Sequence, residues 1–144
     1  MATGTPCVVL SAQQIVSRID ELCDVLEQCV NDGASVSFIH PFNRDKSLPF
    51  WTGVAQSVAR GEIIVLAAEN TQGILVGTVQ LIVDQPENQP HRADVAKLLV
   101  HPSARRTGIA RELMNALETC ARQQHKTTLV LDTATGSAAE LFYH

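Results

Sequence analysis

One stretch in the second half of the chain has the residue types and the spacing that bind phosphate groups. An apolar run ends at Val100-His101-Pro102, and a basic, glycine-containing turn follows it, Arg105-Arg106-Thr107-Gly108-Ile109-Ala110. Apolar residues then recur at helical spacing, so the stretch predicts a strand, a turn and a helix. Because a helix N-terminus has unpaired N–H groups and a partial positive charge, this turn is a candidate site for a pyrophosphate.

Each residue type in the turn suits one part of that chemistry. Gly108 lets the backbone approach phosphates closely, and Ala110 leaves the start of the helix uncrowded. Arg105 and Arg106 can add charge-assisted hydrogen bonds. The turn is neither a P-loop, because no Lys-Ser/Thr pair follows the glycine, nor a G-x-G-x-x-G fingerprint. The short string alone is also compatible with an ordinary helix N-terminus that carries two exposed arginines.

The elements that must position this turn alternate between strand and helix patterns. We expect strands over 7–10, 63–68, 74–83, 92–100 and 127–131, and helices over 11–30, 45–61, 108–124 and from Ser137 to His144. The strand-helix-strand unit over 93–132 predicts a parallel pair with a right-handed crossover, and the hairpin before it predicts antiparallel pairing. The fold class is therefore α/β (α+β), a single domain over 1–144 with a mixed, mostly antiparallel sheet flanked by helices.

Composition excludes several classes of function. The net charge of -4 argues against a general binder of nucleic acid or of anionic membranes. No apolar run approaches the roughly 18 residues of a membrane span, and the N-terminus lacks a signal-peptide pattern, so we expect a cytoplasmic protein. The four cysteines have neither CxxC nor zinc-site spacing. We therefore expect reduced, mostly buried thiols and no metal.

The longer context of the turn resembles the cofactor motif of the GNAT superfamily of N-acetyltransferases. That motif reads apolar strand, V-x-P, Q/R-x-x-G-x-G/A and amphipathic helix, and it corresponds here to Val100-His101-Pro102 and Arg105-x-x-Gly108-x-Ala110. The resemblance extends to Ala138-Ala139-Glu140-Leu141-Phe142-Tyr143 and covers the upstream hairpin by the order of elements. More narrowly, residues 92–143 with Gly33-Ala34-Ser35-Val36 look like the tabtoxin-resistance type of acetyltransferase.

The resemblance implies a cosubstrate, a reaction and a binding site. Acetyl-CoA would donate an acetyl group directly to a primary amine of a small molecule, such as an antibiotic or a toxin. Its pantetheine would pair with the main chain of Leu98, Leu99 and Val100 where two parallel strands splay apart. A main-chain N–H near Leu99 would stabilise the oxyanion. The cofactor-binding residues would further include Arg105, Arg106, Thr107, Gly108, Ile109, Ala110 and Ser137.

Three side chains are candidates for proton transfer. The resemblance matches Tyr143 to the family's helix tyrosine, which acts as general acid toward the CoA sulfur; packing beside Phe142 is the alternative. Asp94 on the cofactor strand and Asp132 at the end of the partner strand could act as base or anchor a cationic amine. As alternatives, Asp94 is a solvated strand residue and Asp132 caps the turn that follows it.

Three further residues are weaker candidates. His101 could act through water or be a solvated loop residue. Phe50 and Trp51 could form a wall of the acceptor pocket, and core packing is the equally supported alternative.

The chain departs from the family pattern after Tyr143. Family members usually continue with a glycine-containing turn and two more strands, so the C-terminal strands are expected to be missing and the last strand to lie near an open edge. A shortened chain, a natural truncation, or a homodimer in which a second chain fills the gap would each explain this. The alternative function is a non-catalytic acyl-CoA-binding or regulatory domain, which would keep the phosphate-binding turn without the acceptor site.

Overall fold

A computed structural model describes residues 7–31, 43–84, 91–104, 107–132 and 138–142 of the chain. Its helices are α1 (Ala12–Ser17), α2 (Ile19–Asn31), α3 (Arg44–Ala59) and α4 (Ile109–Gln123), with a short 3₁₀ turn, η1 (Pro102–Ala104). Its strands are β1 (Cys7–Leu10), β2 (Ile63–Glu69), β3 (Leu75–Ile82), β4 (Arg92–Val100), β5 (Thr128–Asp132) and β6 (Ala138–Phe142).

The strands form one mixed sheet in the order β1-β2-β3-β4-β5-β6. Neighbouring strands run antiparallel except β4 and β5, which are parallel and are joined through α4. A parallel pair needs such a crossover because its strands run in the same direction. The predicted fold class is confirmed, including the parallel strand-helix-strand unit.

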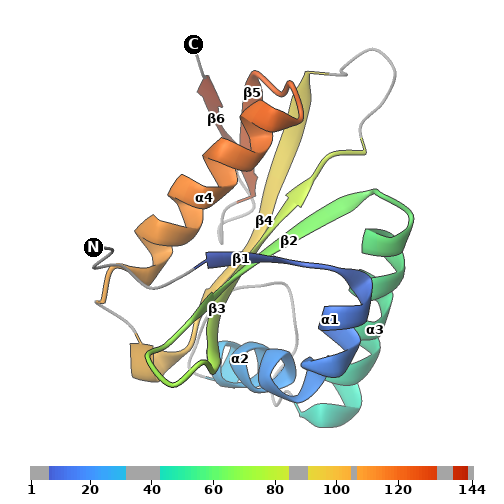
Figure 1. Ribbon diagram of the computed structural model, residues 1–144, viewed down its shortest axis with the longest axis vertical. Helices are drawn as coiled ribbons and strands as arrows, with labels where there is room; N and C mark the ends of the chain where they lie inside the picture. Colours follow the sequence, from blue (N-terminus) through green and yellow to red (C-terminus); the bar gives the residue numbers. More distant parts are fainter. Residues whose placement is uncertain (1–6, 32–42, 85–90, 105–106, 133–137, 143–144) are drawn as a thin grey trace.

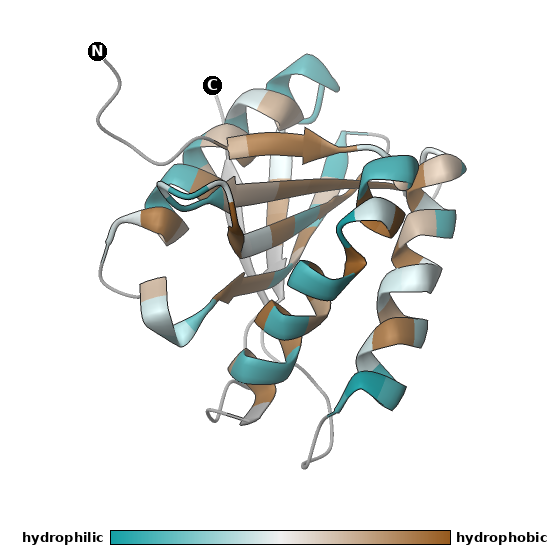
Figure 2. Ribbon diagram, turned by 60° about the horizontal axis from the view of Figure 1, so that its bottom comes forward, coloured by the Kyte–Doolittle hydropathy of each residue, from teal (hydrophilic) through white to brown (hydrophobic). Residues whose placement is uncertain are grey.

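Helices cover both faces of the sheet, and each face has its own core (Figure 1). Leu22, Leu26 and Trp51 from α2 and α3 are buried against one face. Leu113 and Leu117 from α4 are buried against the other. Figure 2 shows mostly hydrophobic strands between helices that alternate between hydrophobic and hydrophilic residues. Burying a leucine side chain stabilises the folded state by about 1.5–3 kcal/mol. The two cores therefore hold β4 and α4 in fixed positions on the sheet.

The first predicted helix is divided in two at Arg18. The predicted capping box is present, because the Ser11 amide donates to Gln14 Oε1 (2.8 Å) and the Gln14 amide donates to Ser11 Oγ (3.1 Å). Arg18 itself is non-helical (φ −114°, ψ 25°), and its guanidinium donates to Glu21, Glu69 and the Gly73 carbonyl. The prediction of one continuous helix over 11–30 was thus wrong at Arg18. The hydrogen bonds of Arg18 to β2 and to the turn after it favour a non-helical backbone there.

The predicted helix from Ser137 to His144 was also wrong. Residues Ala138–Phe142 form β6, which pairs antiparallel with β5, with Leu141 opposite Leu129. A local capping-box pattern predicts a helix, but the outer main-chain groups of β5 need partners, and a strand supplies them. The strand next to β4 is therefore covered by β6, and β1 and β6 are the two edges of the described sheet.

Candidate functional site

The described pairing between β4 and β5 ends at Val95, and the stretch of β4 beyond it, residues 96–100, is called the gap below. Residues Arg92 to Val95 have partners on β5, from Thr128 to Leu131. From Ala96 to Val100, β4 has described partners on β3 alone. Leu98, Leu99 and Val100 therefore lie on the part of β4 beyond its described pairing with β5.

A bulge in β4 lies just beyond the residues that pair with β5. Thr78 lies opposite Leu99 and Gln80 lies opposite Ala96, so β4 has one residue more than β3 between these pairs. Lys97, in this extra segment, has φ 56°, a left-handed conformation that costs a non-glycine residue about 1–2 kcal/mol. A bulge bends a strand and interrupts its pairing, and this one begins after Val95, the last residue of β4 with a described partner on β5.

The main chain of Val100 points away from β3. The His101 amide donates to the Val76 carbonyl (2.7 Å), and Val100 lies opposite Gly77 in the same register. Hydrogen-bonded and non-bonded pairs alternate along antiparallel strands, so Val100 directs its N–H and C=O to the other side and Leu99 directs its own to β3. On that side the Cys29 thiol donates a hydrogen bond to the Val100 carbonyl, with 3.2 Å between Sγ and the oxygen. Val100 therefore fits the predicted main-chain contact better than Leu99.

The helix α4 is the next element after η1, and its N-cap residue makes no side-chain hydrogen bond to the first turn. Gly108 is its N-cap residue, with φ 84° and ψ 6°, and no side chain bonds to the first-turn amides from that position. Thr107, Gly108 and Ala110 are exposed, whereas Ile109 is buried in the core. Ile109 can therefore contribute to a binding site through its main chain. Arg105, Arg106 and Ser137 lie outside the described residues.

A glycine on β3 allows α4 to approach the sheet closely. A Cβ atom at Gly77 would lie 2.8 Å from Ile109 Cγ2 and 3.1 Å from Leu113 Cδ1. This residue was missed in the sequence analysis, although a glycine inside a strand pattern is a known indication of close backbone approach. Gly77 helps to place the start of α4 beside the end of β4.

Known proteins share this arrangement. The sequence pattern of the acetyltransferase (GNAT) family matches residues 24–144. The chain belongs to the GNAT family. It is 31% identical over 127 residues, 81% of this chain and 73% of the relative, to an uncharacterized N-acetyltransferase in the hisH-hisA intergenic region of Azospirillum brasilense. Acetyl-CoA-dependent N-acetyltransferase activity is therefore supported, and the narrower tabtoxin-resistance type stays a prediction.

Solved GNAT structures have the same fold at low sequence identity. An N-acetyltransferase from Staphylococcus aureus Mu50 matches with a TM-score of 0.67 at 16% identity, over 90% of this chain and 73% of that one. The putative acetyltransferase yncA from Salmonella typhimurium, solved with its cofactor acetyl-CoA, matches with a TM-score of 0.66 at 15% identity, over 90% and 69% of the two chains. GNAT relatives that bind acetyl-CoA support it as the cosubstrate.

The carboxylate candidates of this GNAT protein lie on both strands of the parallel pair. The Asp94 carboxylate accepts from Arg92 Nε at 2.9 Å, and it lies opposite Val130, within the paired part of β4. Asp132 follows Leu131, the last residue of β5 that pairs with β4, so its backbone lies where the gap begins. Tyr143 lies outside the described residues. Asp94 is engaged in an ion pair with Arg92.

The aromatic candidates differ in their surroundings. Trp51 is fully buried in the core, which favours packing as its role. Phe50 is half-buried, and its ring centroid lies 5.1 Å from the ring centroid of Trp51. The Nζ atom of Lys97 lies 6.0 Å from the ring centroid of Phe50. Phe50 is therefore the aromatic residue that α3 places beside the bulge of β4.

Three of the four thiols of the GNAT domain are poor nucleophiles. None of the four cysteines forms a disulfide, as predicted, and Cys23, Cys29 and Cys120 are buried. Burial raises the pKa of Cys7, Cys23 and Cys120, so these groups stay protonated at neutral pH. Within the described part of the chain, no three His, Cys, Asp or Glu residues are grouped so that they could hold a metal, and no helix has the length and hydrophobicity to cross a bilayer.

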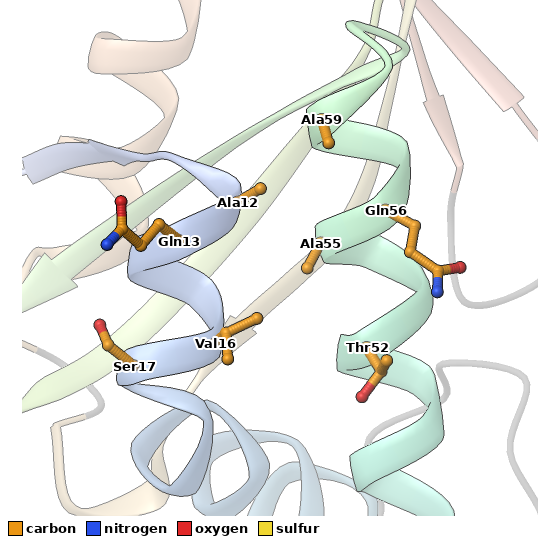
Figure 3. Close-up of a pocket in the computed structure, with 8 residues that line it drawn as sticks. All are labelled: Ala12, Gln13, Val16, Ser17, Thr52, Ala55, Gln56 and Ala59. Atoms are coloured by element: carbon orange, nitrogen blue, oxygen red, sulfur yellow. The ribbon is translucent and has the colours of Figure 1, made fainter.

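A separate groove lies between α1 and α3. It has a volume of about 610 Å³, and Figure 3 shows Ala12 and Val16 of α1 facing Ala55 and Ala59 of α3. Its lining is almost entirely apolar and includes no titratable group. The groove shares no residue with the predicted cofactor site, so it has no part in the chemistry described above.

Proposed function

We propose that this GNAT protein transfers the acetyl group of acetyl-CoA to a primary amine of a small molecule by direct attack. The observation that carries the proposal is that α4, whose N-cap residue makes no side-chain cap, follows in the chain the part of β4 beyond its described pairing with β5. An anion-receptive helix N-terminus and a strand segment beyond its parallel pairing are the two features that suit a nucleotide with an extended amide-containing arm.

The residues present fit such a cosubstrate. The diphosphate would lie on the first-turn amides of α4, with Gly108 permitting close approach and Arg105 and Arg106 adding charge. The pantetheine would lie along Leu98 to Val100, where Val100 directs its main chain away from β3. Acetyl-CoA supplies an acyl group already activated as a thioester. We assign Ser137 a further cofactor contact.

Three groups of the chain would handle protons. A base must deprotonate the incoming ammonium, and Asp132 is our first choice because its backbone lies where the gap begins. Asp94 is the second carboxylate, and its negative charge, partly offset by Arg92, would attract a cationic acceptor. Tyr143 would protonate the leaving thiolate. The raised pKa of the Cys7, Cys23 and Cys120 thiols disfavours a covalent intermediate on these three residues, in keeping with direct transfer.

The acceptor class, the location and the assembly stay predictions from the sequence. An antibiotic or toxin amine is the narrower expectation, in a cytoplasmic protein that forms a homodimer. A non-catalytic acyl-CoA-binding domain is the second candidate. It is favoured by one observation, the ion pair that engages Asp94, the one predicted catalytic side chain within the described residues.

A matched pair of glycine substitutions tests the cofactor site. Gly108→Glu places a carboxylate against the diphosphate, so CoA affinity measured by calorimetry should fall at least about 100-fold, roughly 2.7 kcal/mol. Gly61→Glu is the control, because Gly61 also has a positive φ (76°) with open space at its Cβ position, and it lies after α3. Unchanged affinity in the Gly108 variant would refute the placement of the diphosphate.

Thiol release from acetyl-CoA across a panel of amines separates the two candidate functions. An acetyltransferase releases CoA faster in the presence of at least one primary amine. Thermal stabilisation by CoA without turnover on any amine of the panel would support the binding domain instead. No stabilisation at millimolar CoA would contradict both.

A further inference from the structure

The histidine that follows β4 is bound on both sides of its ring. Its Nδ1 atom lies 3.1 Å from the Ser103 amide nitrogen and 2.8 Å from Ser103 Oγ, and its Nε2 atom lies 3.2 Å from Asp24 Oδ2 on α2. The side chain of His101 is 21% exposed and that of Asp24 is 53% exposed. The ring therefore connects a helix on one face of the sheet with the turn that leads to α4.

These contacts specify one tautomer of the neutral ring. A backbone N–H can only donate, so Nδ1 must accept from Ser103 and cannot carry a proton. The single ring proton of the neutral imidazole then lies on Nε2, where the Asp24 carboxylate accepts it. Asp24 is the one charged side chain among the described residues that contacts the ring. The other titratable group that α2 brings to this end of β4 is the Cys29 thiol, which donates to the Val100 carbonyl.

A chain of hydrogen bonds continues from His101 to the start of α4. The Ala104 amide donates to the His101 carbonyl at 2.9 Å, which closes η1. The Thr107 hydroxyl donates to the Ala104 carbonyl, and Gly108 follows as the N-cap of α4. These bonds connect the ring of His101 to Ser103, its carbonyl to Ala104, and Ala104 to Thr107, the residue before the N-cap of α4.

We propose that His101 is a positioning residue for the diphosphate site: its Nδ1 accepts the Ser103 amide and sets the path of the turn, and its Nε2–H fixes that turn to Asp24 on α2. This inference rests on the proposed function. It gives His101 a structural part in cofactor binding, distinct from the action through water considered in the sequence analysis.

Two substitutions at the same position test the role of Nδ1. His101→Leu removes the acceptor, so the dissociation constant for CoA should rise about tenfold. His101→Asn restores an acceptor, because an asparagine side-chain oxygen readily bonds the amide two residues on, and CoA affinity should stay within about twofold of wild type. Asp24→Ala should weaken CoA binding by about threefold, since it removes the carboxylate that holds Nε2–H and thereby the orientation of the ring.

The control is the histidine that directly precedes β4. His91→Leu removes an exposed imidazole just before Arg92, at the opposite end of β4, and should leave CoA affinity unchanged. Recovery of CoA affinity in His101→Asn is the readout that simple packing would not move, because asparagine restores the acceptor without restoring the shape of the imidazole ring.

The outcomes separate this inference from the proposed function. If wild-type protein fails to bind CoA, the proposed function is wrong. If wild-type protein binds CoA and His101→Leu binds equally well, the inference alone is wrong. It is also overturned if His101→Asn is as weak as His101→Leu, because a restored acceptor would then have no effect. Far-UV circular dichroism confirms that each variant is folded, and His101→Asn against wild type decides the question should His101→Leu not fold.

Discussion

Several residues in unfavourable states lie beside the bulge of β4. Lys97 has a left-handed backbone, and Thr78 and Gln80 lie opposite the residues on either side of the bulge. Among the described residues, Thr78 Oγ1, Gln80 Nε2 and Trp51 Nε1 are buried polar atoms without a hydrogen-bond partner. Each such atom costs about 1–3 kcal/mol. Strain and unpaired groups of this kind concentrate at functional sites, which supports the placement of the reaction here.

Thr78→Val removes one of these unpaired groups without changing the shape of the side chain. We expect the free energy of unfolding, measured in urea, to rise by about 1 kcal/mol, because the hydroxyl is desolvated without compensation. Thr128→Val on β5 is the control, and it should change the free energy of unfolding by no more than about 0.5 kcal/mol. A destabilised Thr78→Val would show that the hydroxyl has a partner.

Tyr143→Phe tests the proposed general acid. Turnover should fall by about 100-fold with little change in CoA affinity, because the hydroxyl acts on the leaving thiolate and not on the bound ground state. Stopped-flow or steady-state thiol release with an amine identified from the panel measures the rate. Unchanged turnover would remove Tyr143 from the mechanism.

The position of α4 depends on its contact with β3. The same Gly→Ala change at two sites tests this, because a Cβ at Gly77 would crowd Ile109 and Leu113 whereas one at Gly53 on α3 meets open space. Gly77→Ala should lower the free energy of unfolding by about 1–2 kcal/mol and should also weaken CoA binding. Gly53→Ala should stabilise by about 0.5–1 kcal/mol, since it favours the helix. Equal effects on chemical unfolding would contradict the close packing of α4.

The Arg18 network connects α2 with β2 and the β2–β3 turn, and it predicts sensitivity to acid. Arg18 donates to Glu21 and lowers its pKa below the ordinary value of 4.5, and the Leu75 amide adds to the effect. A folded-state pKa below the unfolded value means that this stabilisation is complete above about pH 4.5 and is lost as the pH falls through the folded pKa. Glu21→Gln should therefore lose less stability than wild type between about pH 5 and pH 3 in urea unfolding, and Glu118→Gln on α4 is the control. Parallel losses in wild type and Glu21→Gln would contradict the prediction.

In the whole molecule, CoA would complete the sheet where β5 leaves β4. At a concentration of 100 times its dissociation constant, CoA should raise the free energy of unfolding by about 2.7 kcal/mol. Hydrogen exchange should slow at residues 96–100 and 107–111 and change little in β1 and β2, because the ligand contacts the gap and the start of α4. Uniform slowing throughout the protein would indicate global stabilisation without a localised site.

The sequence by itself determined the local elements and the family. The Ser11–Gln14 capping box, the hairpin of β2 and β3 and the strand-turn-helix unit around Gly108 all depend on residues within a few positions of one another. Patterns at spacings of two, three and four residues report such structure directly. The resemblance of residues 100–110 to a cofactor motif then indicated the acetyl-CoA site.

Only the tertiary structure decided the remaining features, because each depends on partners far apart in the chain. Arg18 interrupts a helix through Glu69, 51 residues away, and residues 138–142 form a strand because β5 offers an unpaired side. The bulge at Lys97 and the bond between His101 and Asp24 likewise join segments with no shared local pattern. Contacts of this kind outweigh local propensity, since main-chain pairing and burial act on the folded chain as a whole.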